Sequence, residues 1–408
     1  MPLEKGKRRT APGTVRPAGA GAKAAQVSPS RKKAPAAATD VTGVLKRRDA
    51  RSFTLVDLVR PAAEVIVPAA LIQAQGLVQG ATVSGPVTEG SQGRTLTGVT
   101  AVCGLAPETF RQRRPLAELT AVDPQERFRL AAAGIVALRA IDLLAPIGKG
   151  TRGLIAAPPK AGKTTLLEEI AAGIRAAQPE ARIIVLLIDE RPEELTYFRR
   201  SVSAEVLAST SDRPPAEHTA LAEFMLDHAR VELECGHDVV ILLDSLTRLS
   251  RAFNLQGRGA GRTLSGGIDA AALEIPRRLF GLARQIEGGG SVTVLATILI
   301  ETGSQMDQVI YEEFKSTGNS EIVLSRALAQ DRIFPAIDIA TTGTRKEELL
   351  YDAEEARRLA GLRRGLAGYR PREAMPALLR LLAQYPTNEA LLAQIPKQSE
   401  TKRNAFGG

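Results

Sequence analysis

The segment of the chain best suited to chemistry is APPKAGKT at residues 157–164, which lies between the apolar run GLIAA and the helix-like TTLLEEI. Gly162, Lys163 and Thr164 form the core of a phosphate-binding P-loop signature, although Ala157 stands where the first glycine is usual. In such a loop, successive backbone N–H groups and a helix N-terminus surround phosphate oxygens while the lysine reaches the terminal phosphates. The alternative interpretation of this segment alone is a plain helix N-terminus that carries a lysine.

Two carboxylates follow apolar strand-like runs further along the chain. Asp244 ends VVILLD, and Glu190 ends IIVLLIDE beside Asp189 and Arg191. Ligands of open α/β sheets lie at the carboxyl ends of strands, where Asp244 could hold Mg²⁺ through water and Glu190 could polarise an attacking water. Taken singly, Asp244 could instead be a helix N-cap and Glu190 a solvated strand end. Together with the P-loop, they predict nucleotide hydrolysis.

The elements that would position these residues alternate in type after about residue 134. Near-continuous apolar runs predict strands, and amphipathic stretches between them predict helices. This alternation is typical of a parallel sheet covered by helices on both faces. The predicted strands are RGLIAAP, ARIIVLLIDE, DVVILLDS and SVTVLATILI, and the predicted helices are TTLLEEIAAGIRAA, residues 215–235 and residues 269–287.

The front of the chain has a different character. Short β-rich runs broken by turns predict a small barrel or sandwich. Residues rich in Ala, Pro, Gly, Lys and Arg precede it and cannot bury enough apolar area to offset their ordering entropy. The expected organisation is a disordered basic arm at 1–40, a barrel at 41–103, a connector at 104–133, an α/β domain at 134–390 and a tail at 391–408.

The net charge of +9 is concentrated at the amino terminus. Residues 1–50 hold twelve basic and three acidic side chains, a difference equal to the net charge of the whole chain. No apolar run is long enough to cross a membrane, and the first residues lack the apolar stretch of a secretory signal. Two cysteines, Cys103 and Cys235, cannot form a disulfide framework and suit a reducing cytoplasm. The cysteines and three histidines show no zinc-ligand spacing.

The motifs as a set resemble the Rho family of bacterial transcription termination factors, which are hexameric ATP-dependent RNA helicases. The resemblance runs from about residue 41 to 390 and implies a RecA-type P-loop ATPase core behind an OB- or cold-shock-like barrel. APPKAGKT, with Lys160 inside the loop, is more typical of this family than of a general P-loop. The other segments that carry the resemblance are LLAPIGKGTRGLIA, LLIDERPEELT, VVILLDSLTRLSRAFN, LSGGIDAAAL, GSQMDQVIYEEFKSTGN and RIFPAIDIATTGTRKEELL.

The resemblance implies roles for the matching positions. Lys163 would bind the β- and γ-phosphates of ATP, Thr164 and Asp244 would hold Mg²⁺, and Glu190 would orient the water. Phe334 would stack on adenine. The wider set of expected nucleotide contacts is Gly148, Lys149, Gly150, Thr151, Arg152, Gly153, Lys160, Ala161, Gly162, Lys163, Thr164, Thr165, Arg191 and Phe334.

Two arginines would act across a subunit boundary by the same resemblance. Arg345 matches an arginine finger, and Arg332 matches a second arginine that reaches a neighbour's ATP. A finger supplied by a neighbour is worth about 10³–10⁵ in rate and requires a ring, so a homohexamer is expected. Without the resemblance, ordinary surface charge is the preferred interpretation of both residues.

Two loops would contact RNA in a central channel. The segment 255–267 is glycine-rich and carries Arg258 and Arg262, which could hold a phosphate backbone by charge. A flexible surface loop is its alternative. The segment 301–308 carries Thr302, Gly303 and Gln305, and the family usually has a lysine where this chain has Gln305.

The barrel departs further from the family pattern. Aromatic side chains that stack bases contribute about 1–3 kcal/mol per base. The matching positions here are Ser52, Thr54, Ile66 and Thr95, and Phe53 is either a remnant of the platform or a core residue. The basic arm could compensate by attracting RNA phosphates, or could only aid solubility.

Three functions remain open on the sequence. The leading one is a cytoplasmic ATP-driven RNA translocase that binds single-stranded RNA, acts on the RNA polymerase elongation complex and terminates transcription. The second is a Rho-like paralogue that binds ATP and forms a ring but couples weakly to RNA, acting as a regulator. The third is a RecA-type motor for protein or ion translocation.

Overall fold

Two β-sheets organise the chain. The structure is a computed structural model, and it describes residues 39–49, 52–58, 64–90, 93–257 and 265–395. A six-stranded sheet lies in the amino-terminal part and a nine-stranded sheet lies in the remainder. Within the described residues, no helix is both long and apolar enough to cross a lipid bilayer.

The first sheet is a small closed barrel, as predicted. Its strands pair in the order β1-β2-β3-β5-β4, and β1 pairs again with β4, which closes the circle. All of these pairs are antiparallel except β3 with β5. Alternate residues fill the interior, including Val44, Leu55, Val83 and Leu96. The elements are β1 (Thr39–Arg47), β2 (Phe53–Val56), β3 (Val65–Val67), α1 (Ala69–Gln75), β4 (Thr82–Gly90), β5 (Gly93–Leu96) and β6 (Ala101–Val102).

The second sheet has the parallel core expected of a RecA-type domain. Its strand order is β10-β9-β11-β13-β8-β14-β15, and every pair from β10 to β14 is parallel. The strands are β7 (Ala121–Val122), β8 (Arg152–Ala157), β9 (Arg182–Glu190), β10 (Glu205–Thr210), β11 (Asp238–Asp244), β12 (Arg284–Ile286), β13 (Ser291–Leu299), β14 (Ser320–Val323) and β15 (Gly343–Thr344). The predicted strands at β8, β9, β11 and β13 are all present.

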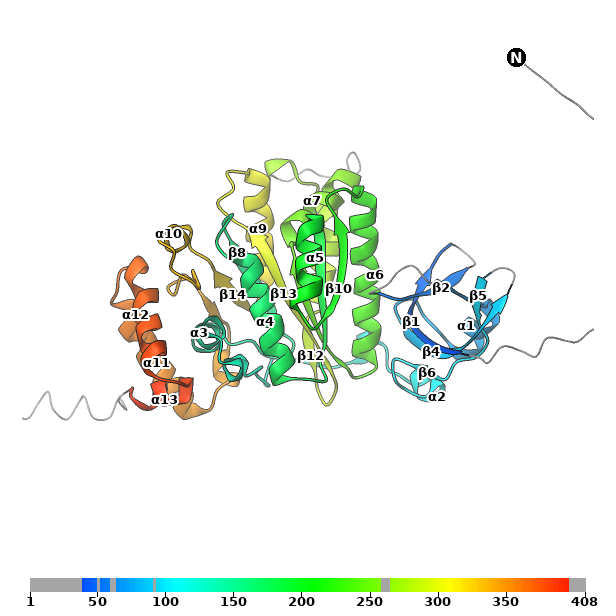
Figure 1. Cartoon of the computed structure of the whole chain (residues 1–408), viewed down its shortest axis with the longest axis horizontal. Coiled ribbons are helices and arrows are strands. Elements are labelled where there is room, and N and C mark those ends of the chain that lie inside the picture. The colour runs from blue at the N-terminus through cyan, green and yellow to red at the C-terminus, as the bar shows by residue number, and fades with distance from the viewer. Residues whose placement is uncertain (1–38, 50–51, 59–63, 91–92, 258–264, 396–408) are drawn as a thin grey trace, which may run out of the picture. The chain divides into compact units, whose positions relative to one another are not determined.

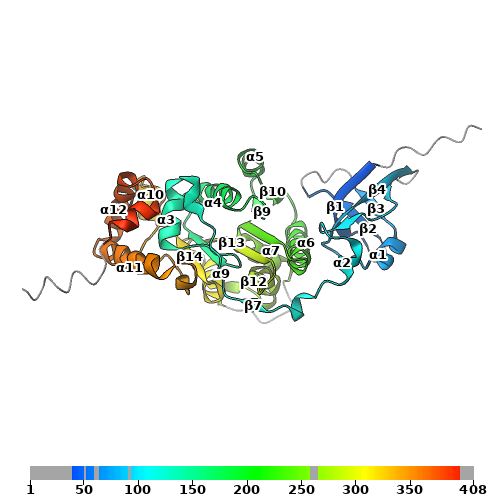
Figure 2. The same ribbon diagram turned by 90° about the horizontal axis from the view of Figure 1, so that it is seen from below.

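Helices cover both faces of this sheet (Figure 1, Figure 2). Residues Ile183, Val185 and Leu187 of β9 pack in one core with α3 and α4, while the residues between them pack in a second core with α6 to α9. This alternation explains why the sequence of β9 is continuously apolar. The helices are α2 (Pro107–Arg111), α3 (Val136–Leu144), α4 (Lys163–Ala177), α5 (Pro192–Ser201), α6 (Pro215–Glu234), α7 (Leu246–Gln256), α8 (Glu274–Gly281), α9 (Gln305–Thr317), α10 (Arg326–Gln330), α11 (Ala353–Ala367), α12 (Pro371–Gln384) and α13 (Asn388–Ala393).

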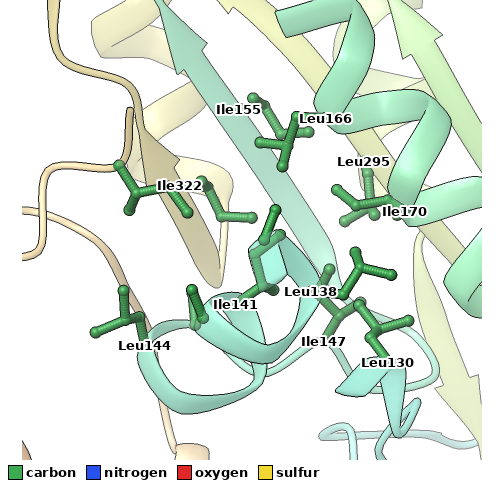
Figure 3. Packing of buried hydrophobic residues seen from close by; sticks show 14 of the residues in the cluster. Leu130, Leu138, Ile141, Leu144, Ile147, Ile155, Leu166, Ile170, Leu295 and Ile322 are labelled. Carbon is green, nitrogen blue, oxygen red and sulfur yellow. The ribbon is translucent and has the colours of Figure 1, made fainter. Parts of the chain in front are cut away.

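Helix α3 is the centre of the first core. Its Leu138 and Ile141 point toward β8 and α4, where Ile155 and Ile170 meet them (Figure 3). Its Arg139 is also buried, and the guanidinium donates to the carbonyl oxygens of Leu382 and Tyr385. Burying a charge is tolerable only when its donors are satisfied, so these bonds fix the end of α12 against α3.

Several boundaries differ from the sequence prediction. The helix expected at 269–287 is only α8, with a short 3₁₀ turn before it, and the chain then forms β12 against β13. Thr39 and Asp40, expected in the basic arm, belong to β1 and pair with β4, while residues 1–38 of that arm lie outside the described residues. The connector contains α2 and contributes β7 to the large sheet. Helix α13 extends into the expected tail.

We expect the Leu138→Ala variant to lose about 2–5 kcal/mol of unfolding free energy, because the side chain is fully buried and its removal leaves a cavity. Urea unfolding followed by far-UV circular dichroism measures the change. Val136→Ala on the same helix is the control, since Val136 is 44% exposed. Equal shifts in the two variants would contradict the assignment of α3 to the core.

Candidate active site

The P-loop lies at the carboxyl edge of the large sheet. Strand β8 ends at Ala157, and α4 begins at Lys163 with Gly162 as its N-cap. Gly162 adopts a φ of 89°, which favours glycine because the residue has no Cβ. The parallel neighbours β9 and β11 end at the same edge, so Glu190 and Asp244 are brought to the amino-terminal end of α4.

Lys163 joins the two carboxylates. Its Nζ lies 2.5 Å from Oδ1 of Asp244 and 3.3 Å from Oε1 of Glu190. Burial acts against the ammonium charge, but the charges of Asp244 and Glu190 outweigh it and raise the pKa of Lys163. Three residues that lie far apart in the sequence therefore form one charged cluster at the phosphate-binding loop.

Asp244 retains an unused oxygen. Its Oδ1 accepts from Thr297 as well as Lys163, whereas its buried Oδ2 has no hydrogen-bond partner among the described residues. Carboxylate oxygens of Glu190, Glu194 and Asp244 lie within 4.8 Å of one another. Oxygen donors of this kind are those that Mg²⁺ prefers. An unpaired buried carboxylate oxygen within such a group fits a divalent cation.

Arg248 completes the cluster and was not identified from the sequence. Its Nε lies 3.1 Å from Oε1 of Glu190, and its Nη1 donates to the backbone oxygen of Asp189 at 2.6 Å. Burial and the charge of Asp244 raise the pKa of Glu190 to about 7, against the opposing charges of Lys163 and Arg248. A carboxylate with a pKa near neutrality suits proton transfer from water. Two signals could have identified Arg248: it lies four residues after Asp244 and within the family-like segment VVILLDSLTRLSRAFN.

Phe334, the residue expected to stack on adenine, lies beside the same loop. A Cβ on Gly162 would be 3.5 Å from the Phe334 ring, and the residue is 47% exposed. Arg332 is exposed two residues earlier, with a φ of 59°. Lys160 is exposed within the loop, and Arg191 is exposed just after Glu190 at the N-cap of α5. Ala161, Thr164 and Thr165 complete the expected set at the loop.

The remaining expected nucleotide contacts lie elsewhere in the chain. Residues 148–153 lie at the amino end of β8, about 20 Å along the strand from the P-loop. Gly148 and Thr151 bond to each other there, and Lys149 forms ion pairs with Glu126 and Asp238. Gly150 and Gly153 are packed closely, because a Cβ would meet Gln285 or Leu295. The structure therefore does not bring residues 148–153 to the P-loop of the same chain.

Arg345 belongs to this second location. It lines a cavity of about 190 Å³ together with Arg152 and Asn319. Asn319 connects the two arginines, since its side-chain oxygen accepts from the backbone N–H of Arg152 and its carbonyl accepts from that of Arg345. The side chain of Arg345 is exposed. Arg345 and Arg152 thus share one surface that is remote from their own P-loop.

The second expected RNA loop precedes α9. Thr302 donates to Oδ2 of buried Asp307 at 2.7 Å, and Arg251 of α7 donates to both oxygens of the same carboxylate. Gly303 has a φ of 76°, and exposed Gln305 is the first residue of α9. Arg258 and Arg262, expected in the other loop, lie outside the described residues.

The barrel positions matched to the family's aromatics are neighbours. Thr54 pairs with Ile66, which pairs with Thr95, so they form a row across β2, β3 and β5. Phe53 is partly buried against the barrel core, and the guanidinium of Arg47 lies 5.4 Å from its ring centre. Phe53 is therefore largely a packing residue.

Comparison with known proteins agrees with this geometry. Residues 137–342 match the family model of the ATP synthase alpha/beta family, nucleotide-binding domain. A transcription termination factor Rho from Streptosporangium roseum is 47% identical over 360 residues, covering 87% of this chain and 92% of that protein. The one from Streptomyces coelicolor is 50% identical, covering 82% and 80%. The chain spans only 53% of the Streptomyces lividans Rho, to which it is 46% identical over 89% of its own length.

Solved structures resemble the chain more distantly. A prototypical ATPase from the type III secretion system of pathogenic bacteria matches with a TM-score of 0.56 at 25% identity, covering 71% of this chain and 88% of that one. The ATPase EscN of enteropathogenic E. coli, solved with its central stalk EscO, matches with a TM-score of 0.54 at 28% identity, covering 65% and 62%. The chain shares an ATPase domain with these secretion-system proteins, but its sequence identity to the termination factors is much higher. The chain belongs to the transcription termination factor Rho family.

Proposed function

We propose that this chain is an ATP-dependent RNA translocase that releases transcripts from RNA polymerase in the cytoplasm. The observation that carries the proposal is the cluster of Lys163, Glu190 and Asp244 at the P-loop, in a chain 42–50% identical to several termination factors named Rho. The cluster supports ATP hydrolysis, and the relatives' name supports the transcriptional role. The type III secretion ATPases favour hydrolysis equally but are only 25–28% identical, so protein translocation is the weaker alternative.

The geometry supports a different role in ATP hydrolysis for each residue of the site. The loop N–H groups and Lys163 would bind the phosphates, which would replace the carboxylates as partners of the ammonium. Thr164 and Asp244 would hold Mg²⁺, which neutralises developing phosphate charge when it is bound. Glu190 would accept the proton of the attacking water. Arg248 would keep the carboxylate of Glu190 at its position, since it bonds both Glu190 and the preceding Asp189.

The placement of Arg345 supports action in trans. It shares a cavity with Arg152 at the opposite end of β8 from the P-loop, so neither can reach the nucleotide of its own chain. In a homohexamer, this surface would face the P-loop of the next subunit. The expected contacts at residues 148–153 would then belong to the neighbour's ATP. Arg332, which lies two residues from Phe334, is closer in the chain to the nucleotide site of its own subunit.

Helix α7 supports coupling between RNA and ATP. The helix begins two residues after Asp244. Its Arg248 forms an ion pair with Glu190, and its Arg251 forms one with Asp307. Residues three apart lie on one side of a helix, so a shift of α7 would move both contacts together. Asp307 in turn holds Thr302 in the loop that would grip RNA.

The first prediction tests hydrolysis and its dependence on RNA. Pyrimidine-rich single-stranded RNA should stimulate phosphate release by the full chain, and Glu190→Gln should lower that rate roughly 10²–10⁴-fold while ATP binding persists, because the general base is lost. Glu193→Gln, an exposed neighbour, is the matched control. Hydrolysis without RNA stimulation would contradict the translocase and favour the regulatory paralogue, whereas unchanged turnover in Glu190→Gln would contradict the assigned base.

The second prediction concerns Arg248. Arg248→Ala should lower turnover roughly 10–100-fold with a smaller change in the KM for ATP, since the residue positions Glu190 rather than binding phosphate. Arg248→Lys should recover part of the rate, because one of the two hydrogen bonds can be kept. Exposed Arg364 supplies the control variant Arg364→Ala. An equal loss in kcat for the alanine and lysine variants, with melting temperature unchanged, would count against positioning by the guanidinium.

The third prediction concerns the RNA loop. Gln305→Lys should tighten RNA binding and steepen its salt dependence by about 0.7 for each additional RNA phosphate that the lysines neutralise. Gln308→Lys adds the same charge about one turn further along α9, at another exposed position, and is the matched control. Fluorescence anisotropy of labelled RNA across a salt series measures both variants. Equal effects of the two lysines would show that only total charge matters and that position 305 does not contact RNA.

A further inference from the structure

The two cysteines of the chain meet in the folded protein. Cys103 follows strand β6 of the barrel, and Cys235 is the C-cap of α6 in the ATPase domain. Cys103 is buried in the barrel core and Cys235 packs against that core. The two are connected through Thr82 and Glu232: the backbone N–H of Cys103 donates to the carbonyl of Thr82, the Thr82 side chain bonds Glu232, and the backbone N–H of Cys235 donates to the carbonyl of Glu232. Both are free. The only two cysteines in 408 residues, one on each domain, therefore lie in the same packed region between the barrel and α6.

A polar network holds the backbone around this pair. The backbone N–H of Cys103 donates to the carbonyl of Thr82 at 2.6 Å, and the Thr82 hydroxyl donates to Oε1 of Glu232 at 2.6 Å. Arg182 donates to the same Glu232 oxygen at 2.8 Å, and Nδ1 of His237 lies 2.6 Å from Oε2. Strand β4 of the barrel is therefore bonded to the last turn of α6, next to the residues that carry the two thiols.

Solvent reaches the pair from one side. A cavity of about 490 Å³ is bordered by Cys103, Gly104 and Gly236, with Arg182 and His237 at its polar side. Cys235 itself is partly exposed, whereas Cys103 is 2% exposed. Because Cys235 is partly exposed, a small oxidant can reach its sulfur.

We propose that Cys103 and Cys235 form a reversible intrachain disulfide that links the barrel to the ATPase domain when the protein meets hydrogen peroxide. Disulfides in proteins of reducing compartments are usually transient and redox-sensing. The link would join the RNA-side barrel to α6, the helix that leads into β11 and Asp244. The inference does not depend on the proposed function, because its chemistry and readouts do not involve ATP or RNA.

The surroundings make Cys235 the attacking residue. The hydrogen bond from the Cys103 thiol lowers the pKa of Cys235, and the positive charges of His237 and Arg113 act in the same direction against burial. The same hydrogen bond and burial raise the pKa of Cys103. Since the thiolate is the nucleophile, oxidation begins at Cys235, and Cys103 acts as the resolving thiol.

The chemistry balances with hydrogen peroxide as the two-electron oxidant. The Cys235 thiolate attacks one peroxide oxygen, so an S–O bond forms, the O–O bond breaks, and the leaving hydroxide takes a proton to become water. The Cys103 sulfur then loses its proton and attacks the Cys235 sulfur, the S–O bond breaks, and a second water leaves. Two thiols are oxidised to one disulfide, and a dithiol such as dithiothreitol reverses the change by exchange.

The test uses the full chain, treated with hydrogen peroxide and then catalase. Thiols counted with Ellman's reagent under denaturing conditions should fall from two per chain to none and return to two after dithiothreitol. Peptide mapping should find one linked peptide that contains both cysteines, and the oxidised monomer should run faster on a non-reducing gel. Its melting temperature should rise by several degrees, because the link closes a long loop of the unfolded chain.

Two variants separate the steps. Cys103→Ser should retain a peroxide-reactive Cys235 that dimedone traps as the sulfenic acid, whereas Cys235→Ser should show no such adduct. Should the buried Cys103→Ser variant fail to fold, the wild-type thiol count and linked peptide still decide the matter. Two free thiols after treatment, sulfinic acids in place of a linked peptide, or disulfides between chains would each overturn the proposal.

Discussion

The ion pairing of one ammonium with two carboxylates is the constraint on which the rest of the ATPase domain depends. Lys163 can lie near Asp244 and Glu190 only if β8, β9 and β11 are parallel strands of one sheet that end at the same edge. A buried charge without partners is costly, so removal of either carboxylate would leave the ammonium poorly compensated. The cluster therefore ties catalytic chemistry to strand order. Oδ2 of Asp244 is buried and has no hydrogen-bond partner in the part of the chain that the structure describes. Such an oxygen costs stability, but it can serve as a ligand to a cation.

Helix α7 extends this constraint from the phosphate site toward the loop at residues 301–308. Ser245 caps the helix by accepting from the backbone N–H of Arg248, so the helix starts in a fixed register relative to Asp244. With this start, the side chain of Arg248 reaches Glu190 and the side chain of Arg251 reaches Asp307. The Arg251–Asp307 pair is bidentate, with N–O distances of 2.6 to 3.0 Å, and such pairs are both strong and direction-specific. The two ends of the proposed mechanism are thus connected by one rigid element rather than by a flexible path.

Local pattern explains which features could be predicted from the sequence. The apolar strands β8, β9, β11 and β13 and helix α4 follow from composition and periodicity alone, and the carboxyl-edge rule brings Glu190 and Asp244 to Lys163. Arg248 could not be predicted in this way, because its role depends on the direction of its side chain across α7. The left-handed backbone of Asp189, with a φ of 57°, is likewise set by tertiary contacts and leaves no composition signal. The helix expected at 269–287 was too long, because residues 284–286 form β12 instead. Their pairing with β13 outweighs the local preference for helix.

The barrel leaves a different physical problem. Its row of Thr54, Ile66 and Thr95 has no aromatic ring for a base to stack on, and Phe53 is occupied by packing and by Arg47. Any affinity of this surface for RNA must then come mainly from charge, which acts at longer range but weakens with salt and carries little sequence information. If the barrel binds RNA by charge, an attachment that limits its movement relative to the ATPase domain raises the effective concentration of RNA at that domain. The Thr82–Glu232–Arg182 network supplies such an attachment to the ATPase domain, and its three residues line the same cavity as Cys103.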